Sequence, residues 1–105
     1  MLITKTFKPN DIVTMKLVTG EEIITKLIAI EDSSYKVNKP LVLSITPQGP
    51  AMTPFLFTAE LEGEISLPKH TVIAVAKTEQ TTTNHYIKGT TGIEPATSSD
   101  FTKIV

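Results

Sequence analysis

The sequence predicts an all-β fold, a small antiparallel barrel or sandwich. Branched aliphatic residues dominate the stretches 11–46 and 71–77, and such side chains fit a pleated sheet better than a helix. Short polar turns, several with glycine or proline, separate the apolar runs. At 105 residues the chain is one domain with a small core, so self-association would help it to bury apolar surface.

The first two strands are predicted at residues 11–18 and 21–30. Gly20 supplies the positive φ that the tight turn between them needs. A polar corner, Glu31-Asp32-Ser33-Ser34, then leads into a third strand at residues 35–46. Asp and Ser hydrogen-bond their own backbone readily, so this corner is a good turn on composition alone.

A helix is the competing interpretation of residues 21–30, because Ile23, Leu27 and Ile30 recur at helical spacing. This interpretation is weaker, since Ile24 and Ile28 would make almost the whole helix surface apolar and no capping residue opens the segment. As a strand, the same segment is apolar on both faces. A second layer or a second subunit must therefore cover it.

The third strand has apolar residues at alternate positions, which predicts that they share one face of the sheet. They are Val37, Leu41, Leu43 and Ile45. Pro40 lies within this run and has no N–H for a ladder hydrogen bond. It predicts an interruption, a bulge or an edge position.

The second half of the chain predicts two further strands and a short extended segment. Residues 47–50 turn the chain, and residues 51–59 form a fourth strand in which Phe55 and Phe57 alternate around Leu56 and pack in the core. Residues 65–67 resume the extended pattern, residues 68–70 turn the chain, and residues 71–77 form the last strand. Short strands at regular spacing indicate a small barrel or sandwich.

The chain divides into an extended N-terminal arm (residues 1–10), a β-barrel domain (residues 11–77) and a polar C-terminal tail (residues 78–105). Thr, Ser, Asn and Gly dominate the tail, which predicts a partly flexible segment. Residues 84–87 offer a site of local docking. We expect His85 and Tyr86 at the surface.

Composition excludes several classes of function. A net charge of −1 gives no global attraction to nucleic acid or to anionic membranes. Ten lysines stand without any arginine, which argues against sequence-specific reading of duplex DNA. There is no cysteine for a disulfide or a thiolate site, and no apolar run long enough to span a membrane. We expect a soluble cytoplasmic protein without a cofactor.

The residues that could serve a metal or catalytic site are few. Glu31, Asp32 and His70 are suitable ligand types, but no spaced cluster of ligands accompanies them. A hydrolase needs a nucleophile, a base that orients it and oxyanion donors, and the sequence offers no credible set of these residues. We therefore predict no metal site and no enzyme activity, and Lys69-His70 on its own is compatible with a plain polar turn.

Two stretches carry a resemblance to a known family. The first runs strand, glycine turn, long strand, acidic corner and strand; its matching positions are Leu17, Gly20, Ile23, Leu27, Ile30 and Glu31. The second is a short turn, Pro68-Lys69-His70, followed by the last strand. In this order they resemble the two motifs of the Sm/LSm family, the second in its Hfq-like form. The LVTGEE turn and the YIKGTTGIE tail also resemble small Sm-like proteins of phages. This resemblance implies that the protein is located in the cytoplasm of a host cell.

The resemblance implies a strongly bent five-stranded sheet, SH3-like in shape, whose last strand pairs with the fourth strand of a neighbour. Such pairing closes a homo-oligomeric ring of five to seven subunits. It also removes an aggregation-prone apolar edge. The implied interface residues are Thr71, Val72, Ile73, Ala74, Val75, Phe55 and Phe57.

The resemblance further implies that single-stranded RNA, or less readily DNA, is bound at the pore rim by Asp32, Ser33, Ser34, Lys69 and His70. Repeated copies of Lys69 would make a cationic funnel, and His70 would donate a hydrogen bond or stack on a base. Ser33 stands where Hfq has a stacking aromatic residue, and Asp32 would repel phosphate. The alternative function is a ring-shaped adaptor that binds protein partners and no nucleic acid.

Overall fold

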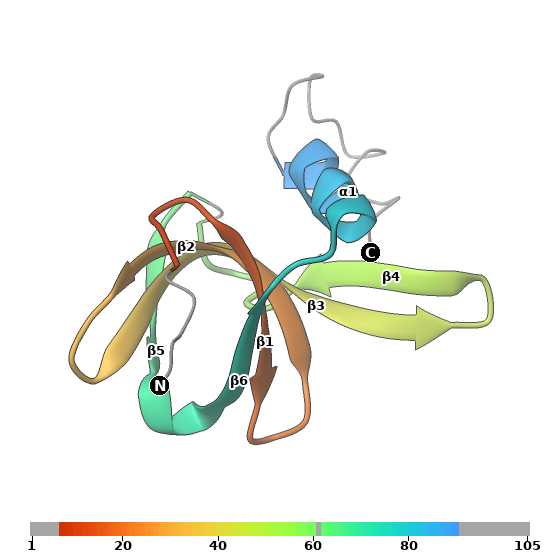
Figure 1. Cartoon of the computed structure of the whole chain (residues 1–105). Coiled ribbons are helices and arrows are strands. Elements are labelled where there is room, and N and C mark those ends of the chain that lie inside the picture. The colour runs from red at the N-terminus through yellow and green to blue at the C-terminus, as the bar shows by residue number, and fades with distance from the viewer. Residues whose placement is uncertain (1–6, 61, 91–105) are drawn as a thin grey trace.

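The computed structural model describes residues 7–60 and 62–90 (Figure 1). Its elements are β1 (Ile12–Leu17), β2 (Glu22–Ile30), β3 (Ser34–Thr46), β4 (Gly49–Pro54), β5 (Glu64–Pro68), a 3₁₀ turn η1 (Lys69–Thr71), β6 (Val72–Lys77) and α1 (Gln80–Thr90). The strands form one antiparallel sheet in the order β4-β3-β2-β1-β6, and β5 also pairs with β3.

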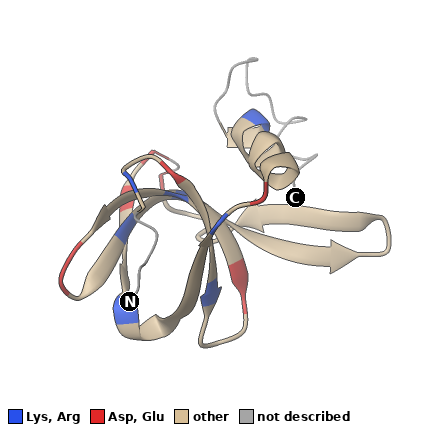
Figure 2. Cartoon of the chain, in the orientation of Figure 1, with Lys and Arg blue, Asp and Glu red and all other residues tan. Residues whose placement is uncertain are grey.

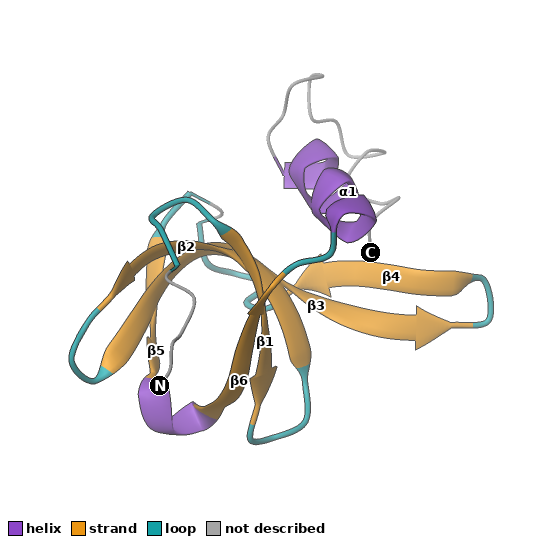
Figure 3. Cartoon of the chain, in the orientation of Figure 1, coloured by secondary structure: helices purple, strands orange, loops and turns teal. Residues whose placement is uncertain are grey.

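The prediction of an antiparallel β fold is confirmed, with two differences. The sheet has six strands, not five, and it is not closed into a barrel. Figure 3 shows the strands curving around one another with α1 lying against one side of the sheet. Within the described residues no helix has the length and apolar character needed to cross a membrane.

The first three strands lie close to their predicted bounds, and Gly20 has the expected positive φ of 108°. The predicted strand over residues 51–59 is confirmed only for residues 51–54, because β4 runs from Gly49 to Pro54. The Phe55 N–H still donates to Pro40 O at 3.0 Å, and there the ladder with β3 ends. Beyond that point the same edge of β3 is occupied by β5.

A β-bulge at Lys39–Pro40 divides β3 into two halves. In the ladder with β2, Leu41 lies opposite Ile24 and Asn38 lies opposite Lys26, so two residues of β3 face Thr25 alone. The backbone accommodates the extra residue at Lys39, whose φ of 54° is in the left-handed region. We call residues 34–38 the inner half of β3 and residues 41–46 the outer half.

The bulge reverses which residues face the main core. Since side chains alternate along a strand, one extra residue moves all later side chains to the opposite face. Val37 is fully buried in the inner core, whereas Leu41 belongs to a separate cluster with Ile24 and Tyr86. The prediction that Val37 and Leu41 share a face is therefore wrong, while the predicted bulge at Pro40 is confirmed.

The inner core lies on the concave side of the curved sheet. Its buried members are Val13, Met15, Leu17, Ile23, Leu27, Val37 and Leu67. They come from β1, β2, the inner half of β3 and β5. Burying each such side chain contributes roughly 1.5–3 kcal/mol relative to exposure, so this cluster holds the strand framework together.

Helix α1 covers the opposite face through Tyr86. The Tyr86 side chain is only 1% exposed and packs on Ile24 and Leu41. Local docking of residues 84–87 is thus confirmed, and the expected surface position of Tyr86 is wrong. The structure also shows that residues 80–90, expected as part of a polar tail, form a helix.

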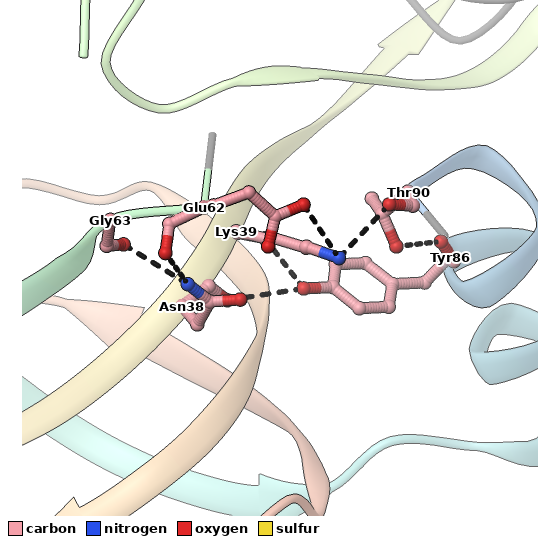
Figure 4. A network of polar contacts seen from close by, with 6 residues as sticks. All are labelled: Asn38, Lys39, Glu62, Gly63, Tyr86 and Thr90. Atoms are coloured by element: carbon pink, nitrogen blue, oxygen red, sulfur yellow. Dashed lines mark hydrogen bonds and ion pairs between the residues drawn. The ribbon is translucent and has the colours of Figure 1, made fainter. Parts of the chain in front are cut away.

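Polar contacts tie α1 to the bulge (Figure 4). The Tyr86 hydroxyl donates to Lys39 O at 2.6 Å, and Lys39 Nζ donates to Thr90 O at 3.1 Å. Lys39 Nζ also lies 3.5 Å from a Glu62 carboxylate oxygen. A bulge leaves its extra residue outside the regular ladder. The Tyr86 hydroxyl of α1 therefore supplies the hydrogen bond that Lys39 O would otherwise lack. Burial raises the pKa of the Tyr86 phenol above its usual value.

Glu79 caps the start of α1. Its carboxylate accepts hydrogen bonds from the Thr81 and Thr82 N–H groups at 3.1 and 3.0 Å, and from the Thr82 hydroxyl at 2.8 Å. The bond from the Thr82 backbone is the main reason that the Glu79 pKa falls to about 2. A helix of only 11 residues gains much from such a cap.

At the other end, residues 1–6 of the predicted arm lie outside the described residues, as do residues 91–105 of the predicted tail. Phe7 packs against the inner core. Asn10 has φ at 75°, and its N–H donates to Leu27 O at 2.6 Å. The chain is therefore anchored to β2 before β1 begins.

Candidate nucleic-acid interface and the sheet edges

The polar corner between β2 and β3 is a tight turn. The Glu31 N–H donates to Ser34 O at 2.8 Å, and the Ser34 hydroxyl lies 3.4 Å from a Glu31 carboxylate oxygen. Asp32 and Ser33 are exposed, and Ser34 is half-buried at the first position of β3. The Ser33 hydroxyl and the carboxylates of Glu31 and Asp32 therefore belong to exposed residues at this corner.

The turn between β5 and β6 is the 3₁₀ turn η1. Pro68 fixes the backbone before it, and the Thr71 hydroxyl donates to Pro68 O at 2.7 Å across the turn. Lys69 is half-buried, and His70 is exposed.

The structure brings the two turns together. The Lys69 N–H donates to Ser33 O at 2.8 Å, and Ser34 lies opposite Pro68 in the ladder between β3 and β5. Asp32, Ser33, Ser34, Lys69 and His70 are thus placed along one continuous piece of surface. Residues that are more than thirty positions apart in the sequence meet because β5 returns antiparallel to the inner half of β3.

Tyr35 is the member of this surface that sequence reasoning missed. The Lys69 ammonium lies over its ring, 5.6 Å from the ring centroid. This is a cation–π distance, and it holds the lysine at the corner. Tyr35 lies opposite Leu67 in the ladder, so only the register between β3 and β5 reveals that it neighbours Lys69.

Charges of both signs occupy this surface. The negative charges are those of Glu31 and Asp32, and the positive charges are those of Lys36 and Lys69. The Lys36 ammonium lies 3.9 Å from a Glu31 carboxylate oxygen. An exposed pair of this kind contributes little to stability. In residues 7–60 and 62–90, no three His, Cys, Asp or Glu side chains gather as metal ligands would.

The residues expected at a subunit interface are divided by the structure. Residues 72–75 lie in β6, where Val72 and Val75 pack against the inner core and Ile73 is 64% exposed. Phe55 also packs against the inner core. Phe57 is 78% exposed in the loop after β4, so its predicted place in the core is wrong.

Strands β5 and β6 each leave one edge without a strand partner among the described residues. The Lys69 N–H donates to Ser33 O, so these two residues form a hydrogen-bonded pair at the end of the ladder between β3 and β5. Hydrogen-bonded and non-hydrogen-bonded pairs alternate along an antiparallel ladder, so the backbone N–H and C=O groups of Glu64 and Ser66 point away from β3. On β6, the Thr78 N–H donates to Ile12 O at 3.2 Å, so Thr78 and Ile12 form a hydrogen-bonded pair. By the same alternation of pairs, the backbone N–H and C=O groups of Val75 and Lys77 point away from β1. Both edges are therefore open to hydrogen bonding.

Strand β4 differs from these two edges. The Phe55 N–H donates to Pro40 O, so these residues form a hydrogen-bonded pair at the end of the ladder between β3 and β4. Because such pairs alternate with non-hydrogen-bonded pairs, the backbone groups of Pro50, Met52 and Pro54 point away from β3. Two of these three residues are prolines and have no N–H. Proline at such positions blocks strand addition, so β4 is a protected edge.

No family model matches the chain, and no curated protein matches it.

Proposed function

We propose that this protein assembles into an Sm-like homo-oligomeric ring and binds single-stranded nucleic acid, RNA more readily than DNA, at the surface formed by the two turns. The hydrogen bond from Lys69 N–H to Ser33 O carries this proposal. It joins the acidic corner and the Lys-His turn into one surface, as the resemblance to the Sm/LSm family requires. The resemblance suggests five to seven subunits.

The open edges of β5 and β6 support assembly. In this pairing β5 replaces the fourth strand expected over residues 51–59, because prolines block the edge of β4. If β6 of one copy runs antiparallel to β5 of the next, the residues with outward backbone groups meet: Lys77 opposite Glu64, and Val75 opposite Ser66. This register places opposite charges directly across the new ladder, which favours it over its neighbours. It also covers β6, whose only charged residue is Lys77.

Assembly would supply the charge that one subunit lacks. Within one chain Lys69 and Lys36 are balanced by Glu31 and Asp32. In a ring, copies of Lys69 held over Tyr35 would repeat around a pore and attract the phosphates of a single strand. His70 is exposed beside them and can donate to a base or a sugar.

The test is fluorescence anisotropy of labelled oligo-U, oligo-A and matched single-stranded DNA at two salt concentrations, on protein whose mass is fixed by light scattering. We expect binding that weakens with salt. Lys69→Ala should weaken it further and reduce the salt slope by about 0.7 for each phosphate that the variant no longer neutralises. Lys88→Ala in α1 is the matched control and should leave both unchanged. An assembled protein that binds none of the three oligonucleotides would contradict the proposal.

Assembly is tested separately through the predicted register. Glu64→Lys and Lys77→Glu each place like charges across the interface, so each should lower the mass of the assembly. The double variant restores opposite charges and should recover it. Single variants with wild-type mass would rule out this register.

A protein-binding adaptor is the second candidate. The balance of charges at the corner and the absence of arginine favour it over nucleic acid. The same titrations separate the two functions, because an adaptor assembles normally and is indifferent to oligonucleotides and to Lys69→Ala.

A further inference from the structure

The hairpin made by the outer half of β3 and by β4 carries no charge. From Leu41 to Ala59 the chain has no Asp, Glu, Lys, Arg or His, although 20% of all its residues are charged. Figure 2 shows the hairpin projecting from the sheet without a single acidic or basic residue. A projecting surface without charge is typical of the buried centre of a protein interface, where charged residues are depleted.

One face of this hairpin is apolar along its whole length. Leu43 and Ile45 alternate on β3, and Met52 and Pro50 lie opposite them on β4. Leu43 and Met52 pack beside the α1 cluster, whereas Ile45 lies two residues farther toward the tip and is 78% exposed. Ile45 is therefore a projecting apolar side chain on a surface that continues under the helix.

A groove lies on the same face, between the hairpin and α1. Its floor is Leu43, Pro50 and Met52, and its wall is Thr81, Thr82 and His85 of the helix. Its volume of about 450 Å³ is ample for one aliphatic side chain. Ile45 lies directly opposite Pro50 of the groove floor, so it borders the groove on the side toward the tip of the hairpin.

The manner of association is restricted by the prolines of β4. Pro50 and Pro54 occupy outward-facing positions and have no N–H, so a partner strand cannot extend the sheet here. A partner must meet the face of the hairpin, through side chains.

We propose that this face docks on the same face of a second copy around a two-fold axis, so that Ile45 of each copy enters the groove of the other. A two-fold interface must be self-complementary, and here the projection and the groove lie on one surface. An uncharged surface also meets its own copy without like-charge repulsion. This contact is independent of the β5 and β6 edges. It joins two rings if the proposed ring forms, and two chains if it does not.

The first test is the mass of Ile45→Lys by light scattering and native mass spectrometry at micromolar concentration. The expected result is half the wild-type mass, because a lysine cannot enter the groove. The control is Ser44→Lys, which adds the same charge one residue away on the opposite face of the hairpin and should keep the wild-type mass. Since Ile45 is exposed, the fold of the variant should be intact by circular dichroism.

A second test is positive and uses the absence of cysteine from the chain. Mixing Ile45→Cys with Thr81→Cys under mild oxidation should give a disulfide between two copies, whereas Ser44→Cys with Thr81→Cys should not. Equal masses for wild type and Ile45→Lys, together with no selective cross-link, would overturn the proposal. A partner other than a second copy gives this negative result.

Discussion

The two halves of β3 belong to one strand and yet serve different surfaces. The inner half pairs with β5, places Val37 in the inner core and begins at the corner that contacts Lys69. The outer half pairs with β4, carries no charge and lies against α1. A single extra residue at Lys39–Pro40 separates them. One bulge thus lets a 13-residue strand present its apolar side chains to two separate clusters.

The largest expected effect comes from deleting Lys39. Without the extra residue the outer half changes face, so Leu41 would leave the α1 cluster and Val42 the inner core. We expect the free energy of unfolding to fall by about 4 kcal/mol or more, measured by urea denaturation. Deleting Thr58, in the exposed loop after β4, is the control and should cost far less. A Lys39 deletion that unfolds at the wild-type urea concentration would show that the bulge does not divide the sheet.

The next effect concerns the helix that covers the outer half. Tyr86→Ala removes a fully buried ring and should destabilise the protein by about 3–5 kcal/mol. Tyr86→Phe keeps the ring but leaves Lys39 O without its donor, and should cost about 1–2 kcal/mol. Thermal or urea unfolding measures both. If the two variants lose equal stability, the hydroxyl and not the ring holds α1.

A smaller effect is expected from the backbone of the bulge itself. Lys39→Gly and Lys39→Ala both remove the ammonium that donates to Thr90 O. They differ in backbone freedom, because φ at 54° is left-handed and suits glycine. We expect the glycine variant to be about 1 kcal/mol more stable than the alanine variant. The opposite order in urea unfolding would show that Lys39 does not adopt this conformation in solution.

The smallest effect is the pH dependence of α1. The Glu79 pKa is lowered from 4.5 to about 2 in the folded protein, so its stabilisation is complete above pH 4.5 and is lost as the pH falls through about 2. Glu79→Gln cannot titrate. The difference in stability between wild type and this variant should therefore shrink between pH 4.5 and pH 2, measured by helical circular dichroism during thermal unfolding. A difference that stays constant over this range would contradict the cap.

Much of the strand framework could be predicted from the sequence, because β1, β2 and β6 have apolar residues at strand spacing between clear turns. The reversal at Lys39 could not. Pro40 indicates an irregularity at this point, but Leu41 and Leu43 continue the alternation begun by Val37. The change of face is therefore invisible to periodicity when both faces of the sheet are apolar. The predicted fourth strand is too long for a related reason, since Phe55 and Phe57 alternate like strand residues without a free edge of β3 to pair with.

The helix was hidden by its composition. Gln80–Thr90 contains four threonines and Gly89, which are poor helix formers, and Tyr86 is its only fully buried apolar residue. Tertiary contacts and the Glu79 cap compensate for this low propensity. The members of the candidate site lie in two turns that the sequence does identify. Their contact through Ser33 and Lys69, and the place of Tyr35 beside them, depend on the register of β5, which no local pattern encodes.

The most direct measurement of the central claim, that β5 and β6 pair between copies, is amide hydrogen exchange along β6, followed residue by residue by NMR. The N–H groups of Ala74 and Ala76 point toward β1, and those of Val75 and Lys77 point away from it. In an assembled ring all four are hydrogen-bonded, so we predict similar protection for all four. Fast exchange at Val75 and Lys77, beside protected Ala74 and Ala76, would show that this edge is free and that the chain does not assemble through it.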